Sequence, residues 1–305
     1  MLDIKFIREN EEAIRGAAKN KNIKLDVNQL LEIDAKRREQ LSKIEKLRNQ
    51  RNRLALAGKS GKPSKEQIEQ GKTLKEQIAE LEKDLAVIEE EYLTLMVKVP
   101  TIPSPDTPIG KDGDDNVEIF RNKEIPVFGF KPKNHVELAG ALDLIDFDRG
   151  TKVAGYRGYY LKNEASLLVM ALMNYALNKM VTKGYTPMMP PTLIKEFALF
   201  GSGYFKGLTY DGRVDEIYQV AISDKEADGT VSRDKKFLVG TAEPSLLAYY
   251  SNEILKEADL PIKLCGFSPC YRSEIGSYGK DTKGLYRVHE FFKVEQVIIC
   301  RADID

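Results

Sequence analysis

The sequence predicts an α+β protein, in which a long antiparallel pair of helices precedes an antiparallel sheet flanked by helices. Three observations support this fold class. A heptad pattern runs through residues 74–95, four prolines interrupt the chain between residues 99 and 108, and short β-branched runs follow residue 117. We therefore expect a helical arm over residues 1–100, a proline-rich linker over 101–116 and a second domain over 117–305.

The apolar pattern of the arm repeats at alternating spacings of four and three residues, as in a coiled coil. Its members are Leu74, Ile78, Leu81, Leu85, Ile88, Tyr92 and Leu95. A second, less regular stripe comprises Leu30, Ile33, Leu41, Ile44, Leu47 and Leu54. Ala57–Pro63 lies between the stripes, and its glycines and proline suit a turn between helices. Two helices of roughly 30 residues joined by so short a turn must run antiparallel, and each extends about 45 Å.

Charge is distributed unevenly over these two helices. From residue 35 to 62 there are ten Lys or Arg and two Glu, whereas from 64 to 96 there are four Lys and nine Asp or Glu. One interpretation is a solvated coiled coil whose opposite charges pair across the hairpin. The other is a grip on an RNA backbone. The residues that concentrate the positive charge are Arg37, Arg38, Lys43, Arg48, Arg51 and Arg53.

The second domain contains short strand candidates at hairpin-like spacing, with helices between them. One helix is expected from about Asn163 to Lys183, ended by Gly184, and another over Pro244–Leu255. The expected strands are Val117–Phe120, Lys152–Tyr160, Tyr185–Met189, Glu216–Ala221, Lys236–Gly240, Ile262–Tyr271, Gly284–Phe292 and Lys293–Cys300. The sequence has no dinucleotide-binding or P-loop glycine pattern, so a Rossmann or Walker-type nucleotide site is not expected.

The composition limits which cellular compartments and binding partners are expected. Lys plus Arg and Asp plus Glu both number 47, so any nucleic-acid surface must be a local patch. The three cysteines, Cys265, Cys270 and Cys300, are expected to be reduced thiols rather than zinc ligands. The charged N-terminus lacks the apolar core of a signal peptide, and no apolar run approaches the ~18 residues of a membrane span. These features predict a cytoplasmic protein without a membrane-spanning segment.

The most informative segment is residues 270–296, CYRSEIGSYGKDTKGLYRVHEFFKVEQ. It is expected to form a strand, a polar loop over Ile275–Lys283 and a returning strand. Arg272 and Glu274 are two residues apart, which in a strand places them on one face. Taken alone, such a pair is readily explained as a cross-strand ion pair. On the returning strand the same alternation groups Arg287, His289, Phe291 and Lys293.

Over Arg272–Glu295 this segment resembles motif 2 of class II aminoacyl-tRNA synthetases, in the form found in the seryl-tRNA synthetase family. Gly184–Leu193 (GYTPMMPPTL), with the helix before it, resembles motif 1, the dimer-forming element of that class. Leu238–Leu246 (LVGTAEPSL) resembles the T-A-E loop that binds serine in the seryl enzymes, and Gly201–Phe205 (GSGYF) also fits. The helical hairpin is similar to the arm with which these enzymes hold the long variable arm of their tRNA. The resemblance therefore covers essentially the whole chain.

The resemblance implies a bacterial-type serine–tRNA ligase, which activates serine with ATP and transfers it to tRNA-Ser and also to tRNA-Sec. It places Arg272 on the ATP α-phosphate as the catalytic residue. The implied ATP-binding residues are Arg272, Ser273, Glu274, Arg287, Val288 and Phe291. The implied serine-binding residues are Thr241, Ala242, Glu243, Arg272 and Glu295. Glu295 is expected to bind the ammonium or hydroxyl group of serine. Alanine has no hydroxyl group and would leave the Glu295 carboxylate without that hydrogen-bond donor.

The resemblance also implies partners for the surface. The tRNA would contact the arm and the motif 2 loop through Arg37, Arg38, Arg48, Arg51, Arg53, Lys280 and Lys283. A second copy of the chain would bind through the motif 1 region to form a homodimer. Class II adenylation needs no protein base, because the carboxylate of serine is the nucleophile. His289 is therefore expected to make a structural hydrogen bond rather than to act as a base.

The family pattern continues to a third motif, which carries an ATP-binding arginine and metal-binding residues, and this sequence does not contain it. We therefore expect a sheet without its last strands, Mg²⁺ bound with ATP but without protein ligands in this chain, and 305 residues that are catalytically incomplete alone. One alternative is a truncated, non-catalytic paralogue or fragment that binds tRNA or serine. A third interpretation, a coiled-coil scaffold, conflicts with the presence of Thr241, Arg272, Glu274 and Glu295 together.

Overall fold

The structure is a computed structural model that describes residues 2–57, 64–205, 207–222, 224–274 and 283–301. The chain divides into two compact units, Met1–Glu124 and Ile125–Asp305. Two long helices dominate the first unit, and the second contains two three-stranded sheets, a two-stranded sheet and flanking helices. This arrangement confirms the predicted α+β class.

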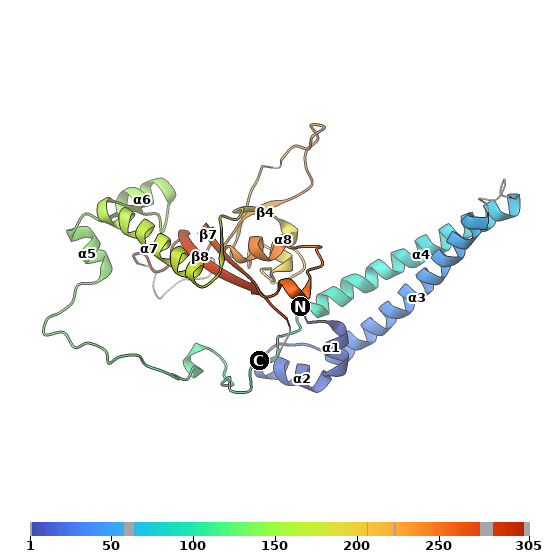
Figure 1. Ribbon diagram of the computed structural model, residues 1–305, viewed down its shortest axis with the longest axis horizontal. Coiled ribbons are helices and arrows are strands. Elements are labelled where there is room, and N and C mark those ends of the chain that lie inside the picture. The colour runs from blue at the N-terminus through green and yellow to red at the C-terminus, as the bar shows by residue number, and fades with distance from the viewer. Residues whose placement is uncertain (1, 58–63, 206, 223, 275–282, 302–305) are drawn as a thin grey trace. The chain divides into compact units, whose positions relative to one another are not determined.

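The first unit is built on α3, Val27–Ala57, and α4, Lys65–Met96, which lie side by side as an extended hairpin (Figure 1). Every residue of the two predicted apolar stripes is buried or half-buried. Ser64 begins α4 with a capping box. The Ser64 hydroxyl accepts a hydrogen bond from the Gln67 backbone N–H, and the Gln67 side chain accepts one from the Ser64 backbone N–H. The predicted two-helix arm is confirmed, and turn residues 58–63 lie outside the described residues.

Two short helices that the sequence analysis did not predict form the base of this hairpin. They are α1, Ile4–Glu9, and α2, Glu11–Asn20. Their apolar residues join the start of α3 and the end of α4 in one cluster, which comprises Ile7, Ile14, Val27, Leu30, Ile33, Leu95 and Met96. Buried Asp34 lies 3.4 Å from Arg8 and 3.0 Å from Arg38. The base is therefore a four-helix core to which the arm is anchored.

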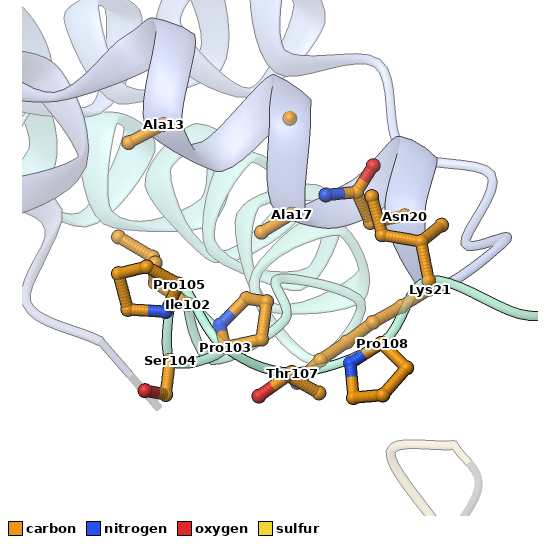
Figure 2. A pocket seen from close by; sticks show the side chains of 12 residues that line it. Ala13, Ala17, Asn20, Lys21, Ile102, Pro103, Ser104, Pro105, Thr107 and Pro108 are labelled. Atoms are coloured by element: carbon orange, nitrogen blue, oxygen red, sulfur yellow. The ribbon is translucent and has the colours of Figure 1, made fainter. Parts of the chain in front are cut away.

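The proline-rich segment that follows α4 lies along α2. Lys21 Nζ donates to Thr101 Oγ1 at 2.9 Å, and the short side chains of Ala13 and Ala17 face residues 102–109 across a small pocket (Figure 2). Beyond a 3₁₀ turn at Gly113–Asp115 the chain is extended and exposed. The predicted strand Val117–Phe120 is wrong, because these exposed residues have no partner strand among the described residues with which to form a ladder.

The main sheet of the second unit has the strand order β3–β7–β8. β7, Ile262–Tyr271, and β8, Glu290–Ile299, pair antiparallel along their full length, from Ile262 opposite Ile299 to Tyr271 opposite Glu290. β3, Thr186–Met188, pairs with β7 in parallel. The prediction of an antiparallel sheet is therefore wrong at this edge. A parallel pair needs a long crossover, which the chain between β3 and β7 provides.

Helices pack against both faces of this sheet. α7, Asn163–Thr182, contacts all three strands, and Val169 and Met170 on it line a pocket with Phe292 of β8. α9, Glu243–Ala248, packs with Leu246 against Leu264 and Val297 on the other face. Because side chains alternate along a strand, the face that α9 covers also carries Phe291, Lys293 and Glu295.

A smaller sheet, in the order β4–β6–β5, precedes α9. Its strands are β4, Leu193–Lys195, β5, Tyr218–Gln219, and β6, Lys236–Leu238. It packs with α8, Glu196–Gly201, around an apolar cluster of Ile194, Ala198, Leu199, Phe205, Ile217, Phe237 and Val239. The remaining elements are α5, His135–Ala141, β1, Ile145–Asp146, α6, Phe147–Ala154, β2, Tyr160–Leu161, and a 3₁₀ turn at Glu257–Asp259.

Several predicted elements of this unit need correction. Lys152–Tyr160 is largely not a strand, because α6 occupies its first residues and is capped by Asp146, which accepts from the Arg149 backbone at 2.9 Å. The predicted strands Gly284–Phe292 and Lys293–Cys300 are one continuous strand, β8, because β7 offers it ten paired positions. α9 ends at Ala248 rather than at Leu255, and Asn252 then adopts a left-handed backbone with φ of +63°. β5 is shorter than the predicted Glu216–Ala221.

No helix among the described residues is long and apolar enough to cross a membrane.

Candidate functional site

Glu295 lies at the centre of a polar cluster on β8, opposite Gly266 of β7. Its carboxylate accepts hydrogen bonds from the Thr241 hydroxyl and, at 3.2 Å, from the backbone N–H of Glu243. Lys293 Nζ donates to Glu295 Oε1 at 2.9 Å and to Thr241 Oγ1 at 2.8 Å. The Glu295 side chain is 15% exposed and that of Lys293 is 35% exposed. The cluster is therefore shielded at the carboxylate and open on the side of the lysine.

The surroundings of Glu295 keep it ionised. Burial raises the pKa of its carboxyl group, but the hydrogen bonds from Thr241, Lys293 and the Glu243 backbone lower this pKa, and their combined effect prevails. At neutral pH the cluster thus holds a carboxylate and an ammonium in direct contact. A carboxylate held in this way can accept a hydrogen bond from the ammonium or hydroxyl group of a small ligand.

Arg272 lies beside this cluster, directly after the end of β7. Its Nε donates to the carbonyl of Gly240 at 3.1 Å, and its guanidinium lies 5.4 Å from the ring centroid of Phe291. Gly240 leaves room for the Tyr204 hydroxyl, which a Cβ at this position would displace. Burial raises the pKa of that hydroxyl and the charge of Arg272 lowers it, with burial prevailing, so Tyr204 stays neutral. The Arg272 side chain is therefore held by Gly240, the residue before Thr241, and its guanidinium lies next to the ring of Phe291.

The prediction that Arg272 and Glu274 share one strand face is wrong. β7 ends at Tyr271, and Glu274 has a left-handed backbone with φ of +53°, which interrupts the alternation of a strand. Arg272 is held instead by His289, whose carbonyl accepts from the Arg272 backbone N–H at 2.9 Å and whose Nδ1 lies 2.9 Å from the Arg272 carbonyl. The expected structural hydrogen bond of His289 is thus present.

Glu274 and Arg287 form a second charged cluster at the same end of the sheet. The two side chains are ion-paired, and Nη1 of Arg157 lies 3.7 Å from Glu274 Oε2. Arg287 also approaches Glu216 at 4.0 Å. The side chains of Glu274 and Arg157 are 6% and 3% exposed, so this carboxylate is held by two guanidinium groups away from water.

The other predicted site residues lie around these clusters. The side chain of Ala242 is buried in the apolar cluster beneath α9, so its backbone is the part that can face a ligand. Val288 is buried, and the Ser273 backbone N–H donates to the Glu216 carbonyl at 3.4 Å. Lys283 is exposed. Lys280 and most of the predicted loop lie outside the described residues.

The five arginines predicted to bind tRNA divide into two groups along the arm. Arg37 pairs with Glu89 at 3.1 Å and lies over the ring of Tyr92, Arg48 pairs with Glu82 at 2.7 Å, and Arg38 pairs with Asp34. Arg51 and Arg53, near the end of α3, are exposed and have no ion pair within the described part of the chain. Pairing within α3 or across the hairpin therefore describes the lower arm, whereas the described end of α3 presents unpaired positive charge.

Lys293 and Arg157 belong to these clusters but are not among the site residues predicted from the sequence. A signal was available for Lys293, because it stands two residues before Glu295 and alternation places both on one face. Arg157 lacked such a signal. It comes from the turn between α6 and β2, has φ of +65°, and reaches Glu274 through the tertiary fold.

The described residues contain no group of three or more His, Cys, Asp or Glu side chains that could hold a metal ion. Cys265, Cys270 and Cys300 are not in disulfide bonds, and burial raises the pKa of the Cys265 and Cys270 thiols.

Comparison with known protein families agrees with the two halves of this description. Residues 1–103 match the seryl-tRNA synthetase N-terminal domain, and residues 226–305 match the tRNA synthetase class II core domain (G, H, P, S and T).

Curated relatives match almost the whole chain. A serine–tRNA ligase of Borreliella burgdorferi (strain ZS7) is 41% identical over 99% of this chain and 68% of its own length. The serine–tRNA ligases of Treponema denticola and Deinococcus radiodurans are each 39% identical, over 98% and 99% of this chain respectively and 68% of their own lengths.

Solved structures show the same similarity. The seryl-tRNA synthetase of Pyrococcus horikoshii, in complex with ATP, is 34% identical with a TM-score of 0.74, over 98% of this chain and 69% of its own. The cytoplasmic serine–tRNA ligase of Naegleria fowleri, in complex with AMP, is 26% identical with a TM-score of 0.72, over 98% of this chain and 67% of its own.

Proposed function

This chain belongs to the seryl-tRNA synthetase family, and we propose that it is a serine–tRNA ligase. In the proposed reaction a carboxylate oxygen of serine attacks the α-phosphorus of ATP and pyrophosphate leaves. The seryl group then passes from the adenylate to a hydroxyl of the terminal adenosine of tRNA-Ser, and AMP leaves. The observation that carries the proposal is the cluster of Thr241, Lys293 and Glu295 next to Arg272. The relatives are ligases, so the alternative of a non-catalytic paralogue is not favoured.

We propose that ATP binds to Arg272, Ser273, Glu274, Arg287, Val288 and Phe291. The support is the position of the Phe291 ring next to the Arg272 guanidinium, because a base stacked on that ring would bring its α-phosphate toward the arginine. A planar guanidinium can hold two phosphate oxygens and offset the charge that develops during attack. Glu274 would face the adenine amino group while Arg157 and Arg287 hold its carboxylate in place.

We propose that serine binds to Thr241, Ala242, Glu243, Arg272 and Glu295. Ionised Glu295 accepts hydrogen bonds from the Thr241 hydroxyl, the Glu243 backbone and Lys293. Each carboxylate oxygen can accept more than one hydrogen bond, and the ammonium or hydroxyl group of serine would supply a further donor. Alanine lacks the hydroxyl, and a buried acceptor left without its donor is costly.

Mg²⁺ would enter with the triphosphate of ATP and neutralise part of its charge. We assign it no protein ligand, because no cluster of three metal-binding side chains exists among the described residues.

For tRNA we propose a division of labour. The arm over residues 1–100 contacts the tRNA, residues 101–116 link it to the remainder, and residues 117–305 form the catalytic domain. Arg51 and Arg53 are the strongest candidates for phosphate contacts, because they carry unpaired charge on the described arm. The positive electrostatic potential of the arm would also include Arg37, Arg38 and Arg48, which keep their ion pairs. The acceptor end of the tRNA would contact Lys280 and Lys283. The transfer of serine to tRNA-Sec stays a prediction.

We further propose a homodimer through α7 and β3. α7 exposes a set of large apolar side chains: Leu167, Leu168, Met170, Leu172 and Tyr175. Apolar side chains gathered on one exposed helix are typical of a protein–protein interface. The cytoplasm is the proposed compartment, because tRNA charging takes place where protein is synthesised.

The proposal is tested by serine-dependent exchange of pyrophosphate into ATP. Glu295→Gln should raise the KM for serine roughly ten- to a hundredfold, because a charged hydrogen-bond partner contributes about 1.5–3 kcal/mol. Glu290→Gln is the matched control, because Glu290 lies exposed on the same strand outside the cluster. An unchanged KM for serine in Glu295→Gln, or an equal change in both variants, would show that the serine site is wrongly placed.

A further inference from the structure

Lys293 makes two charged contacts within the cluster that the proposed function assigns to serine. Its ammonium donates to Thr241 Oγ1 at 2.8 Å and to Glu295 Oε1 at 2.9 Å. It stands on β8 opposite Ser268, on the face that α9 covers, and about a third of its side chain is exposed. The lysine thus belongs to the cluster and also borders the open side of it.

An amino acid presents two opposite charges at its head, an ammonium and a carboxylate on one carbon atom. Glu295 and Lys293 present the complementary pair, a carboxylate and an ammonium in contact. A serine whose ammonium binds Glu295 would therefore have its own carboxylate within reach of Lys293. A pair of this kind matches a zwitterion better than it matches a simple amine or a simple acid.

We propose that Lys293 binds the carboxylate of the serine substrate and guides it toward the α-phosphate of ATP. The inference rests on the proposed function, because it takes Glu295 as the ammonium site. It adds a residue and a role, since the nucleophile of the reaction is this same carboxylate.

The position of Arg272 makes a second cation useful. Arg272 lies beside Phe291, and Lys293 follows Phe291 by two residues on the same face, a step of about 7 Å along a strand. If Arg272 holds the α-phosphate, an anionic nucleophile must approach an anionic centre. Lys293 offsets part of that repulsion and aims the carboxylate at the phosphorus.

The step balances without a proton transfer. One carboxylate oxygen of serine forms a bond to the α-phosphorus, and the bond from that phosphorus to the pyrophosphate oxygen breaks. Lys293 remains an ammonium throughout, and the electron pair of the broken bond leaves with pyrophosphate.

Serine and serinamide separate this role from a merely structural one. Serinamide keeps the ammonium and hydroxyl groups of serine but has no negative charge, and it can be measured as an inhibitor of pyrophosphate exchange. In Lys293→Met we expect the KM for serine to rise at least tenfold, whereas the inhibition constant of serinamide changes less than threefold. The KM for ATP should also change less than threefold. Lys293→Arg, which keeps the charge, should recover part of the loss.

Lys263→Met is the matched control. Lys263 lies on β7 opposite Ile298, on the other face of the same sheet, and lies near the ring of Tyr185. Its loss should leave the constants for serine, serinamide and ATP unchanged. Lys293→Gln provides a second neutral variant that can still hydrogen bond to Thr241, and circular dichroism establishes that each variant is folded.

The outcomes are distinct. If Lys293 only supports Thr241 and Glu295, serine and serinamide will weaken together, which overturns the inference. Unchanged serine kinetics in both Lys293→Met and Lys293→Gln also overturn it. If Glu295→Gln likewise leaves serine unaffected, the proposed serine site itself is wrong. Loss in Glu295→Gln with no change in Lys293→Met refutes the role of the lysine alone.

Discussion

The helical arm and the β7–β8 site use charged residues in opposite ways. On the lower arm the charges pair locally or across one hairpin, as in Arg37 with Glu89 and Arg48 with Glu82, and these pairs remain partly exposed. At the site, polar and charged groups from distant segments are brought together and shielded, as in Thr241 with Glu295 and Arg157 with Glu274. Exposed pairs contribute little to stability, whereas shielded groups can be tuned for binding. Substitutions should therefore have small effects on the arm and large ones at the site.

The largest effect is expected from Arg272→Ala. Loss of a charge that is positioned for the developing transition state typically lowers the rate by about 10²–10³-fold. We expect this loss in kcat for serine-dependent pyrophosphate exchange, with a smaller change in the KM for serine. Arg213→Ala serves as the control, because Arg213 pairs with its neighbour Asp211 on the surface. Equal activity of the two variants would contradict the role of Arg272.

Two glycine substitutions allow the packing around α2, at the base of the arm, to be compared with the packing before β8. Gly284 has φ of +80°, and an added Cβ would overlap Nε2 of His135, which also accepts from the Leu285 backbone at 3.2 Å. Gly284→Ala should lower the free energy of unfolding by about 1–3 kcal/mol. Gly16 lies inside α2 with no neighbour within 4 Å of an added Cβ, so Gly16→Ala should raise this free energy by about 0.5–1 kcal/mol. Urea unfolding followed by circular dichroism measures both, and effects of the same sign would contradict this difference in packing.

On the arm, unpaired and paired arginines should behave differently toward tRNA. Arg51→Ala with Arg53→Ala should weaken tRNA-Ser binding and reduce the slope of log K against log salt by about one unit for each phosphate that is no longer neutralised. Arg37→Ala with Arg48→Ala should instead lower the stability of the arm by about 1 kcal/mol, with less change in that slope. Filter binding at several salt concentrations distinguishes them. A larger slope change in the second pair would reverse the assignment.

The smallest effect concerns the acid stability of the site. The pKa of Glu295 is lower in the folded chain than its ordinary value. The stability that Glu295 contributes is therefore fully present above its unfolded pKa and is lost as the pH falls through its folded pKa. The difference in unfolding free energy between the native chain and Glu295→Gln should shrink as the pH is lowered below about 5. A difference that grows toward low pH would mean that the carboxyl group is protonated in the folded state.

The arm was predictable because a local repeat of apolar residues determines its fold. The seam from Leu74 to Leu95 fixes the face of α4, and the two apolar stripes fix the antiparallel partner. α1 and α2 escaped prediction because each is short and acquires its stability from the four-helix base. The predicted strand Lys152–Tyr160 is wrong over its first three residues, because they belong to α6, the helix that Asp146 caps.

The site was predictable only in part. Thr241, Arg272 and Glu295 stand in motifs whose resemblance indicates their roles, and the structure brings them together. The left-handed turn at Glu274, the parallel pairing of β3 and the approach of Arg157 depend on contacts between segments far apart in sequence. Local alternation and propensity carry no information about such contacts, which is why these features were missed.

The central claim is that the Glu295 cluster activates serine and that the end of the arm serves tRNA alone. The direct test is serine-dependent pyrophosphate exchange, measured without tRNA in a full-length enzyme that carries this sequence, for the native form, the Arg51→Ala/Arg53→Ala variant and Glu295→Gln. We expect native kcat/KM for serine in the arm variant and a loss of roughly ten- to a hundredfold in Glu295→Gln. Loss of exchange in a folded arm variant, or its retention in Glu295→Gln, would contradict the account.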